Sequence, residues 1–596
     1  MHNKFIIDLL IMVHFISVWL KIRIIQHTMR VYLHKSQIQI KKNPNFHLMK
    51  KVLMYLVIVL LVSCDFKSEE VDLILHNGYI YTLNQENDIH RAIAIKDGEI
   101  VDIGPEHKIL NKYSHKEKID LKGKPVYPGF IDAHCHFLGL GESMLWADLA
   151  GTSSFEEVLE RLEGYKSRFT HHWILGRGWD QNDWVDQNFP TNKRLNELFP
   201  NQPVYLSRID GHAAIVNDYA LELAGITCYT EIEGGEIQKE NLSCTGVLVD
   251  NAMEVVSALI PSMSREDKEI AFKLAEKKCI ESGLTSLHDA GMSYKDILFI
   301  DSLHKTSDLK IGVYAMFSDS EENFDYVATN KPPKTSRLSA NSFKFYADGS
   351  LGSYGACLVK PYSDKNSSAG FLLKSPEYFK SKAELLYDLG IQMNTHCIGD
   401  SANRVMLNIY ADVLNGSNDR RWRIEHCQVV QKEDLRYFKE YNIIPSVQPL
   451  HATSDYPWFL ERLGKKRALS AYSNKELLNQ TGIIALGTDF PVETCNPLNT
   501  FYAAVFRKNL LGKPVSGIQP ANALDRLAAI KGMTKWSAIS SFQEKEKGTL
   551  ELGKNADLVI LDRDILKVKE EFIPNTKVVY TYILGEQVYK NSEVRN

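Results

Sequence analysis

The chain lacks the features that mark nucleic-acid-binding and small redox proteins. Its formal net charge of −4 offers no basic excess, and no long like-charge block or low-complexity tract occurs after the first seventy residues. None of its nine cysteines forms a CxxC pair, which excludes a zinc ribbon and a thioredoxin-type motif. We therefore expect no nucleic-acid partner.

The composition is that of a large globular enzyme. The 596 residues are 44% hydrophobic and 24% charged, which is enough apolar material for more than one core. Against this background, His134 and His136 in FIDAHCHFLG stand out, because alternation along a strand points both imidazoles the same way. Such a pair can share a metal ion, although two ordinary polar strand residues would give the same pattern.

Further candidate ligands lie at or just past the ends of short apolar runs: Lys344 in SFKFYADGS, His396 in IQMNTHCIGD, His426 in RWRIEHCQ and Asp489 in IIALGTDFP. Strand ends carry the chemistry of (β/α)8 barrels, which use about 30 residues per strand and helix. His396 and His426 are 30 residues apart, and Asp489 follows 63 residues later. We therefore expect HCH on the first strand, Lys344 on the fourth, His396 on the fifth, His426 on the sixth and Asp489 on the eighth.

This order of HxH, Lys, His, His and Asp resembles the pattern of the amidohydrolase superfamily. The resemblance covers nearly all of the chain after the N-terminal leader segment that is described below. The stretches YPGFIDAHCH, DGHAAIVND, TSLHDAG, FYADGSLGS, THCIGD, IEHCQ and LGTDFPVE are similar to the branch that includes the N-substituted formamide deformylases. The resemblance implies an α/β fold, a (β/α)8 TIM-like barrel with a large insertion, and a small β-sandwich built from both chain ends.

Imidazole and carboxylate ligands without thiolate suit zinc best, with iron, manganese and cobalt as alternatives. The resemblance implies that Lys344 reacts with carbon dioxide to give a carbamate that bridges two ions. In that arrangement one ion is held by His134, His136 and Asp489, and the other by His396 and His426. The alternative is a surface lysine whose stem lies along the barrel rim, in a site with a single metal.

Such ions lower the pKa of a bound water and polarise a carbonyl. Asp489 would then take the proton of the attacking hydroxide and pass it to the leaving nitrogen. His288 in LHDAG, expected at the end of the third strand, is a candidate for stabilising the oxyanion, or for a structural role, and His212 in DGH is a candidate for orienting substrate. Glu425 precedes a ligand on its strand, so we expect it to face away and to support the ligands or the core.

Residues 71–126 alternate apolar and polar positions around Asn77-Gly78 and Asp97-Gly98, which predicts hairpins. Residues 547–596 repeat this pattern, with turns at Gly553 and Gly585. These are the two parts of the expected β-sandwich, and residues 127–546 are the expected barrel.

The stretch between His136 and Lys344 is too long for three barrel units, so we expect an insertion at approximately residues 145–280. Its segments rich in Trp, Asp, Asn and His could line a substrate pocket. Alternatively, Trp173, Trp179 and Trp184 form the core of the insertion itself.

The segment MKKVLMYLVIVLLVSC has a positive start, an apolar stretch and then Leu61-Val62-Ser63-Cys64, which resembles a bacterial lipobox. We expect residues 49–63 to be a signal peptide, Cys64 to carry the lipid, and residues 64–70 to be a tether. The protein would then be an exported bacterial lipoprotein, anchored in a membrane on its periplasmic or cell-surface face. A plain transmembrane anchor is the alternative, for which the apolar run is short.

Residues 1–48 precede an ordinary start at Met49, and we expect them to be a non-native upstream extension. The competing interpretation is a membrane segment in FIIDLLIMVHFISVWL, which Asp8 and His14 interrupt.

Three cysteines, Cys135, Cys397 and Cys427, directly follow expected ligand histidines, and we expect them to be buried apolar residues that face away from the site. Cys228 and Cys244 in the insertion are the candidate disulfide.

Together these features predict a metal-dependent hydrolase of non-peptide carbon–nitrogen bonds, acting through a metal-bound hydroxide on a small amide such as an N-acyl or N-formyl amine. A hydrolase of cyclic amides, esters or lactones would use the same hydroxide. A non-catalytic ligand-binding lipoprotein on this fold is a third interpretation, but such a module has no chemical need for His396, His426 and Asp489 together. The sequence leaves the oligomeric state open.

Overall fold

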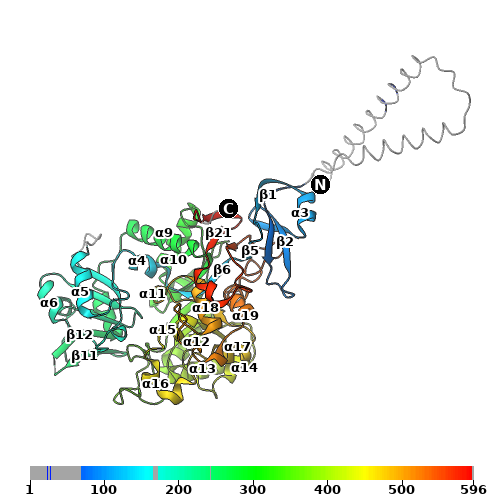
Figure 1. Cartoon of the computed structure of the whole chain (residues 1–596). Coiled ribbons are helices and arrows are strands. Elements are labelled where there is room, and N and C mark those ends of the chain that lie inside the picture. The colour runs from blue at the N-terminus through cyan, green and yellow to red at the C-terminus, as the bar shows by residue number, and fades with distance from the viewer. Residues whose placement is uncertain (1–22, 24–26, 28–68, 166–171, 242, 594–596) are drawn as a thin grey trace, which may run out of the picture. The chain divides into compact units, whose positions relative to one another are not determined.

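The computed structural model describes residues 69–165, 172–241 and 243–593, together with Arg23 and His27. The expected leader and the expected lipid site at Cys64 lie outside the described residues. Between Glu69 and Glu593 the strands form three sheets (Figure 1). No helix in the described part is both long and apolar enough to cross a membrane.

The central sheet has eight parallel strands in sequential order, which confirms the predicted barrel. Its strands are β6 (Phe130–Cys135), β13 (Leu284–Met292), β14 (Gly312–Ser318), β15 (Leu338–Tyr346), β16 (Gln392–Cys397), β17 (Arg423–His426), β18 (Ile444–Val447) and β19 (Ala485–Leu486). The helices that connect or follow them include α9 (Arg265–Glu281), α10 (Tyr294–Lys305), α11 (Glu321–Thr329), α12 (Pro376–Leu389), α13 (Asp400–Leu414), α14 (Arg436–Glu440), α17 (Asn474–Thr481), α19 (Arg526–Gly532) and α20 (Lys535–Ser540).

The barrel strands place apolar residues outside and polar residues inside. On β17, Ile424 belongs to the apolar layer beneath the helices, whereas Arg423 and Glu425 reach His288 and His134 across the interior. The three cysteines that follow ligand histidines are also buried in the apolar layer, as predicted: Cys135, Cys397 and Cys427. Chemistry is thus confined to the interior and the strand ends.

The barrel closes where its first and last strands meet. Asp132 on β6 accepts hydrogen bonds from the Thr488 backbone at 3.0 Å and from its hydroxyl at 2.7 Å, just after β19. The Asp489 N–H donates to the His134 carbonyl at 2.7 Å. Gly487 is required between them, because a Cβ there would lie 2.5 Å from the His134 nitrogen. The LGTD motif therefore closes the barrel and places Asp489 beside the HCH strand.

The insertion lies wholly between the first and second barrel strands. Its six-stranded sheet has the order β11-β12-β10-β9-β8-β7. The strands are β7 (Ala147–Asp148), β8 (Ile174–Trp179), β9 (Val204–Arg208), β10 (Ala213–Val216), β11 (Gly235–Glu240) and β12 (Ser243–Asp250), and the helices are α5 (Phe155–Gly164), α6 (Lys193–Leu198), α7 (Asp218–Leu223) and α8 (Asn251–Ser257). Trp173, Trp179 and Trp184 are buried in its apolar clusters, so they form the insertion's own core.

The location of the insertion corrects one strand assignment. His288 lies on β13, the second barrel strand, and was expected on the third. The strand-like runs between His136 and His288 pair with one another in the insertion sheet, so none of them counts as a barrel strand.

Both ends of the described chain contribute to the third sheet, which has the order β22-β21-β20-β5-β1-β2-β3 with β4 beside β1. Its strands are β1 (Glu69–Tyr81), β2 (Ile89–Lys96), β3 (Glu99–Gly104), β4 (Tyr113–Asp120), β5 (Pro125–Pro128), β20 (Leu558–Leu561), β21 (Val578–Ile583) and β22 (Glu586–Lys590). The Asp97-Gly98 turn joins β2 to β3 as predicted, with φ values of 50° and 82°. The hairpin predicted at Asn77-Gly78 is wrong: β1 continues through it, with an irregular register against β2 between His76 and Ile80.

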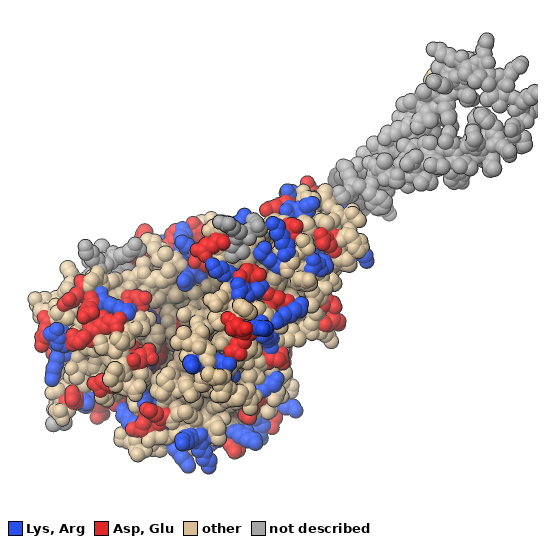
Figure 2. Space-filling view, viewed as in Figure 1, with Lys and Arg blue, Asp and Glu red and all other residues tan. Residues whose placement is uncertain are grey.

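The surface carries charges of both signs, as the nearly equal numbers of basic and acidic residues predict. On the face shown in Figure 2, acidic and basic side chains are interspersed, and no large basic patch is visible there.

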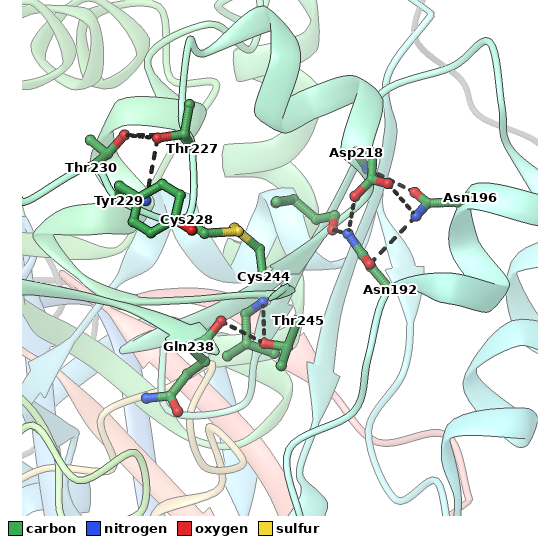
Figure 3. The surroundings of a disulfide bond; sticks show 12 residues. Asn192, Asn196, Asp218, Thr227, Cys228, Tyr229, Thr230, Gln238, Cys244 and Thr245 are labelled. Carbon is green, nitrogen blue, oxygen red and sulfur yellow. Dashed lines mark hydrogen bonds between the residues drawn. A yellow bond between two sulfur atoms is a disulfide. The ribbon is translucent and has the colours of Figure 1, made fainter. Parts of the chain in front are cut away.

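Cys228 and Cys244 form a disulfide in the insertion, as the sequence suggested. It joins the loop after α7 to the start of β12, close to the hydrogen-bonded Asn192, Asn196 and Asp218 (Figure 3). The bond closes a loop with a sequence separation of 16 residues. Because such a cross-link restricts the unfolded chain, it stabilises the insertion by about 3 kcal/mol.

We expect Cys228→Ser to lower the free energy of unfolding of the insertion by about 3 kcal/mol. Native-state proteolysis, which detects local opening, should show faster cleavage within the insertion. Cys357→Ser, which removes a free thiol outside the insertion, is the matched control. Equal cleavage of wild type and Cys228→Ser would contradict the stabilising role.

Candidate metal centre

The six residues expected as ligands converge at the carboxyl ends of the barrel strands. Asp489 Oδ1 lies 3.2 Å from His136 Nε2 and 3.5 Å from His134 Nε2. Lys344 Nζ lies 3.3 Å from His134 Nε2. The ring centroid of His426 lies 4.7 Å from that of His134 and 4.5 Å from that of His396. One ligand atom each from His134, His426 and Asp489 lies within 4.8 Å of the others, close enough to share one cation.

Two hydrogen bonds orient the histidines toward a shared point. His134 Nδ1 is 2.5 Å from Glu425 Oε2, and His426 Nδ1 is 2.7 Å from Gln448 Oε1. When Nδ1 donates to a carboxylate or amide oxygen, the Nε2 lone pair is left for a metal. Gln448 follows β18 directly and precedes the short helix α15 (Pro449–Ser454).

Glu425 faces the barrel interior, which corrects the expectation that it points away. The alternation ends at His426, whose φ is 69°, so this strand end presents successive residues to the same region. Glu425 also binds Arg423, at 2.6 Å from Nε and 2.8 Å from Nη2. Burial alone would raise the pKa of Glu425, but Arg423 and His134 lower it below its usual range. The carboxylate is therefore ionised and holds the imidazole of His134, a candidate metal ligand. This contact is the one that its predicted supporting role requires.

The imidazoles are held neutral. Burial lowers the pKa of His134 to about 4 and lowers the pKa values of His396 and His426 well below the usual range. A neutral imidazole keeps the lone pair that a metal ion binds. Burial also lowers the pKa of Lys344 to about 8, so about a tenth of its amine is uncharged at pH 7, far more than for an ordinary lysine.

Asp489 has a partner that the sequence interpretation missed. His451 Nε2 lies 3.3 Å from Asp489 Oδ2, and His451 Nδ1 lies 3.3 Å from Glu493 Oε1. Burial lowers the pKa of His451, but the hydrogen bonds to the two carboxylates outweigh it and raise the pKa to about 10. His451 comes four residues after β18, so the strand-end pattern that identified the other histidines also contains this one.

The donor set fits a divalent cation. Asp489 Oδ1 is buried and accepts no hydrogen bond from the described residues, although it faces two imidazole nitrogens. Neutral nitrogen lone pairs and a carboxylate oxygen repel one another at these distances unless a cation or proton lies between them. His134, His136, His426 and Asp489 would hold such an ion, with His396 and Lys344 beside them.

The two other candidate residues differ in position. His212 Nδ1 lies 2.6 Å from Asp250 Oδ1, and its ring centroid is 5.0 Å from that of His396. His288 lies against Arg423, with Nδ1 3.2 Å from Nη1, and against Tyr314, inside the barrel. His212 lines two cavities that meet at the ligands, whereas His288 lines neither. The oxyanion role predicted for His288 therefore gains no support from its position.

Two cavities of about 850 Å³ and about 550 Å³ share His212, His396, His426 and Asp489 in their walls. The larger one is lined by apolar insertion residues such as Trp146, Leu175 and Met253. The smaller one is lined by carboxylates, including Asp180, Asp455 and Glu493. Residues of the insertion therefore form much of the wall around the space beside the candidate metal ligands.

A parallel barrel with imidazole, carboxylate and lysine groups at its strand ends defines the class of metal-dependent barrel hydrolases. The chain belongs to the amidohydrolase family, whose sequence pattern matches residues 117–589.

Relatives match over most of their length. YtcJ of Bacillus subtilis is 30% identical over 87% of this chain and 99% of its own. The N-substituted formamide deformylase of Arthrobacter pascens is 26% identical over 87% of this chain and 99% of its own, so the resemblance to that branch is distant. The crystal structure of an uncharacterized metal-dependent hydrolase from Pyrococcus horikoshii is 32% identical, with a TM-score of 0.69 over 84% of this chain and 99% of that one.

We expect Glu425→Gln to lower the affinity for zinc by about 10–100-fold, because it weakens the group that orients His134. Competition with a chromophoric chelator measures this affinity. Glu276→Gln is the matched control, since Glu276 is a buried carboxylate on α9 that accepts the Lys310 and Ile311 amides away from the site. A similar loss in both variants would show that Glu425 acts only through stability.

Proposed function

We propose that this amidohydrolase cleaves a non-peptide carbon–nitrogen bond in a small amide, an N-acyl or N-formyl amine. The observation that carries the proposal is that His134, His426 and Asp489 each offer one ligand atom within 4.8 Å of the others, beside two cavities. His136 Nε2 lies 3.2 Å from Asp489 Oδ1 in the same group of side chains. A divalent cation bound there, zinc by the donor set, would polarise a carbonyl and acidify a water.

The chain's own groups supply the proton transfers. Asp489 Oδ1 faces the histidine nitrogens, which leaves Oδ2, beside His451, as the oxygen that takes a proton from the attacking water. The same oxygen then gives the proton to the leaving nitrogen. His451 holds Asp489 in place for both steps, and His212 is positioned to orient substrate where the cavities meet.

Lys344 is proposed to be carboxylated, and the carbamate would then hold a second ion with His396 and His426. In that case His134, His136 and Asp489 would hold the first ion, and His426 would join them only in a site with a single metal. Its burial and lowered pKa favour this reaction, because only the uncharged amine attacks carbon dioxide. Two ions per chain follow from a bridging carbamate, and one ion follows from an unmodified lysine.

The test is hydrolysis of the N-formyl and N-acetyl forms of phenethylamine and phenylalanine, with phenethyl acetate as the ester. We expect metal near two ions per chain by elemental analysis, turnover lost on chelation, and recovery with zinc and bicarbonate. His396→Ala and Asp489→Ala should each lower turnover by at least about 10²–10⁴-fold, with folding checked by circular dichroism. His107→Ala, an exposed histidine on helix α3 (Glu106–Lys112), is the control.

Unchanged turnover in both ligand variants would overturn the site. Cleavage of the ester alone would replace amide hydrolysis by ester hydrolysis. Metal binding without turnover of any compound would favour the ligand-binding module.

We further propose that the protein is exported and anchored by lipid on Cys64. The Cys228–Cys244 disulfide supports export, because disulfides persist in oxidising compartments. Intact-mass analysis of the chain extracted from bacterial membranes should give a species that begins at Cys64 and carries the lipid. Cys64→Ala should remain unprocessed, whereas a soluble unmodified chain from wild type would contradict the proposal.

A further inference from the structure

Two arginines on neighbouring insertion strands reach the cavities, but only one of them is neutralised. Arg208 on β9 lies 2.6 Å from Asp210 through Nη1, and it also binds Asp180 and the Gln181 side chain. Arg177 on β8 makes no ion pair with any described residue. It donates from Nη2 to the Ile209 carbonyl at 2.8 Å and from Nη1 to Ser207 Oγ at 3.4 Å.

The Arg177 guanidinium therefore has N–H groups that no described residue accepts. A guanidinium carries five N–H groups, and the Nε of Arg177 is buried without an acceptor among the described residues. The side chain as a whole is half-buried. A partly desolvated cation without an ion pair is costly, whereas a carboxylate can bind a guanidinium through two parallel hydrogen bonds. The missing partner is an anion.

The position of Arg177 makes a substrate the natural source of that anion. Arg177 lines the larger cavity together with His136, His396 and Asp489. A Cβ on Gly211 would be 3.6 Å from Nη1, so the guanidinium packs against the turn that carries His212. It thus lines the same cavity as the candidate metal ligands, so one small molecule in that cavity can meet both.

None of the carboxylates that line the larger cavity forms an ion pair with Arg177, although Asp210 and Asp489 lie near enough to act on it electrostatically. Glu142 on helix α4 (Phe137–Ser143) lines the cavity but makes no ion pair with Arg177, and burial raises the pKa of Glu142 to about 7. Trp146, Leu175 and Met253 form apolar walls nearby. Lys344 and Lys374 also line this cavity, but Arg177 is the guanidinium there that has no ion pair with a described residue, and it lies beside apolar surface.

We infer that Arg177 binds a carboxylate of the substrate, so that the substrate class is an N-acylated amino acid with an apolar side chain. The inference rests on the proposed amide hydrolysis and specifies which amides are cleaved. The scissile amide lies at the ligands, the carboxylate at Arg177 and the apolar group against Trp146 and Leu175.

The test compares N-formylphenylalanine, in its L and D forms, with N-formylphenethylamine, which lacks only the carboxylate. For the wild-type full chain we expect kcat/KM to be about 10–100-fold higher for one form of the acid. Arg177→Met should remove this preference, mainly through KM, and change kcat/KM for the neutral amide by less than about threefold. Arg177→Lys should restore part of it, because a lysine is a cation without the fork. Arg194→Met on α6, an exposed arginine of the insertion, should behave as wild type.

A binding measurement separates this inference from the proposed function. Isothermal titration of the chelated full chain with N-formylphenylalanine needs no turnover, and Arg177→Met should weaken binding at least tenfold relative to wild type and Arg194→Met. Equal binding by all three chains would overturn the inference. Equal wild-type kcat/KM for acid and neutral amide, or an equal loss for both in Arg177→Met, would also overturn it while leaving amide hydrolysis intact. Binding that depends on Arg177 without hydrolysis of any compound would instead retain the carboxylate site and overturn the proposed function.

Discussion

The contact between the first and last barrel strands is the constraint on which the site depends. Asp132 holds the Thr488 backbone, Gly487 allows the close approach, and the Asp489 amide binds the His134 carbonyl. The segments that close the barrel are thus the segments that carry metal ligands. A change that opened this contact would separate Asp489 from His134, so folding and ligand geometry cannot vary independently here.

Inside the barrel, a buried arginine and a buried glutamate neutralise each other. Arg423 and Glu425 form a buried pair, and Glu425 in turn engages His134. A buried ion pair contributes little net stability, because desolvation offsets much of the attraction. Its effect here is positional: it presents Glu425 in ionised form to one imidazole, and Arg423 also reaches the Ala133 carbonyl of the HCH strand. The polar side chains of the barrel interior therefore hold the candidate ligands in position, whereas the apolar packing lies outside the strands.

The sequence predicted the barrel and the assembly of its ligand-type residues, because the spacing of His396, His426 and Asp489 follows from the repeat of strand and helix. It did not predict features that depend on tertiary contacts. The positive φ of His426 brings Glu425 inward, whereas strict alternation would point it out. Asn77-Gly78 has hairpin composition but lies within β1, where pairing with β2 overrides the local preference. His451 was detectable by its place after a strand, but its pairing with Asp489 needed the fold.

The insertion occupies one continuous stretch, from β7 to α8, and none of the six ligand-type residues lies in it. Arg177, His212 and part of the apolar wall of the larger cavity, including Leu175 and Met253, do. The candidate metal ligands and the residues proposed to bind substrate therefore lie on separate segments of the chain. Mutations between residues 147 and 257 can diversify what the enzyme accepts while the metal ligands stay unchanged. That stretch is therefore a segment that could be exchanged as one piece without touching any of the six ligand-type residues.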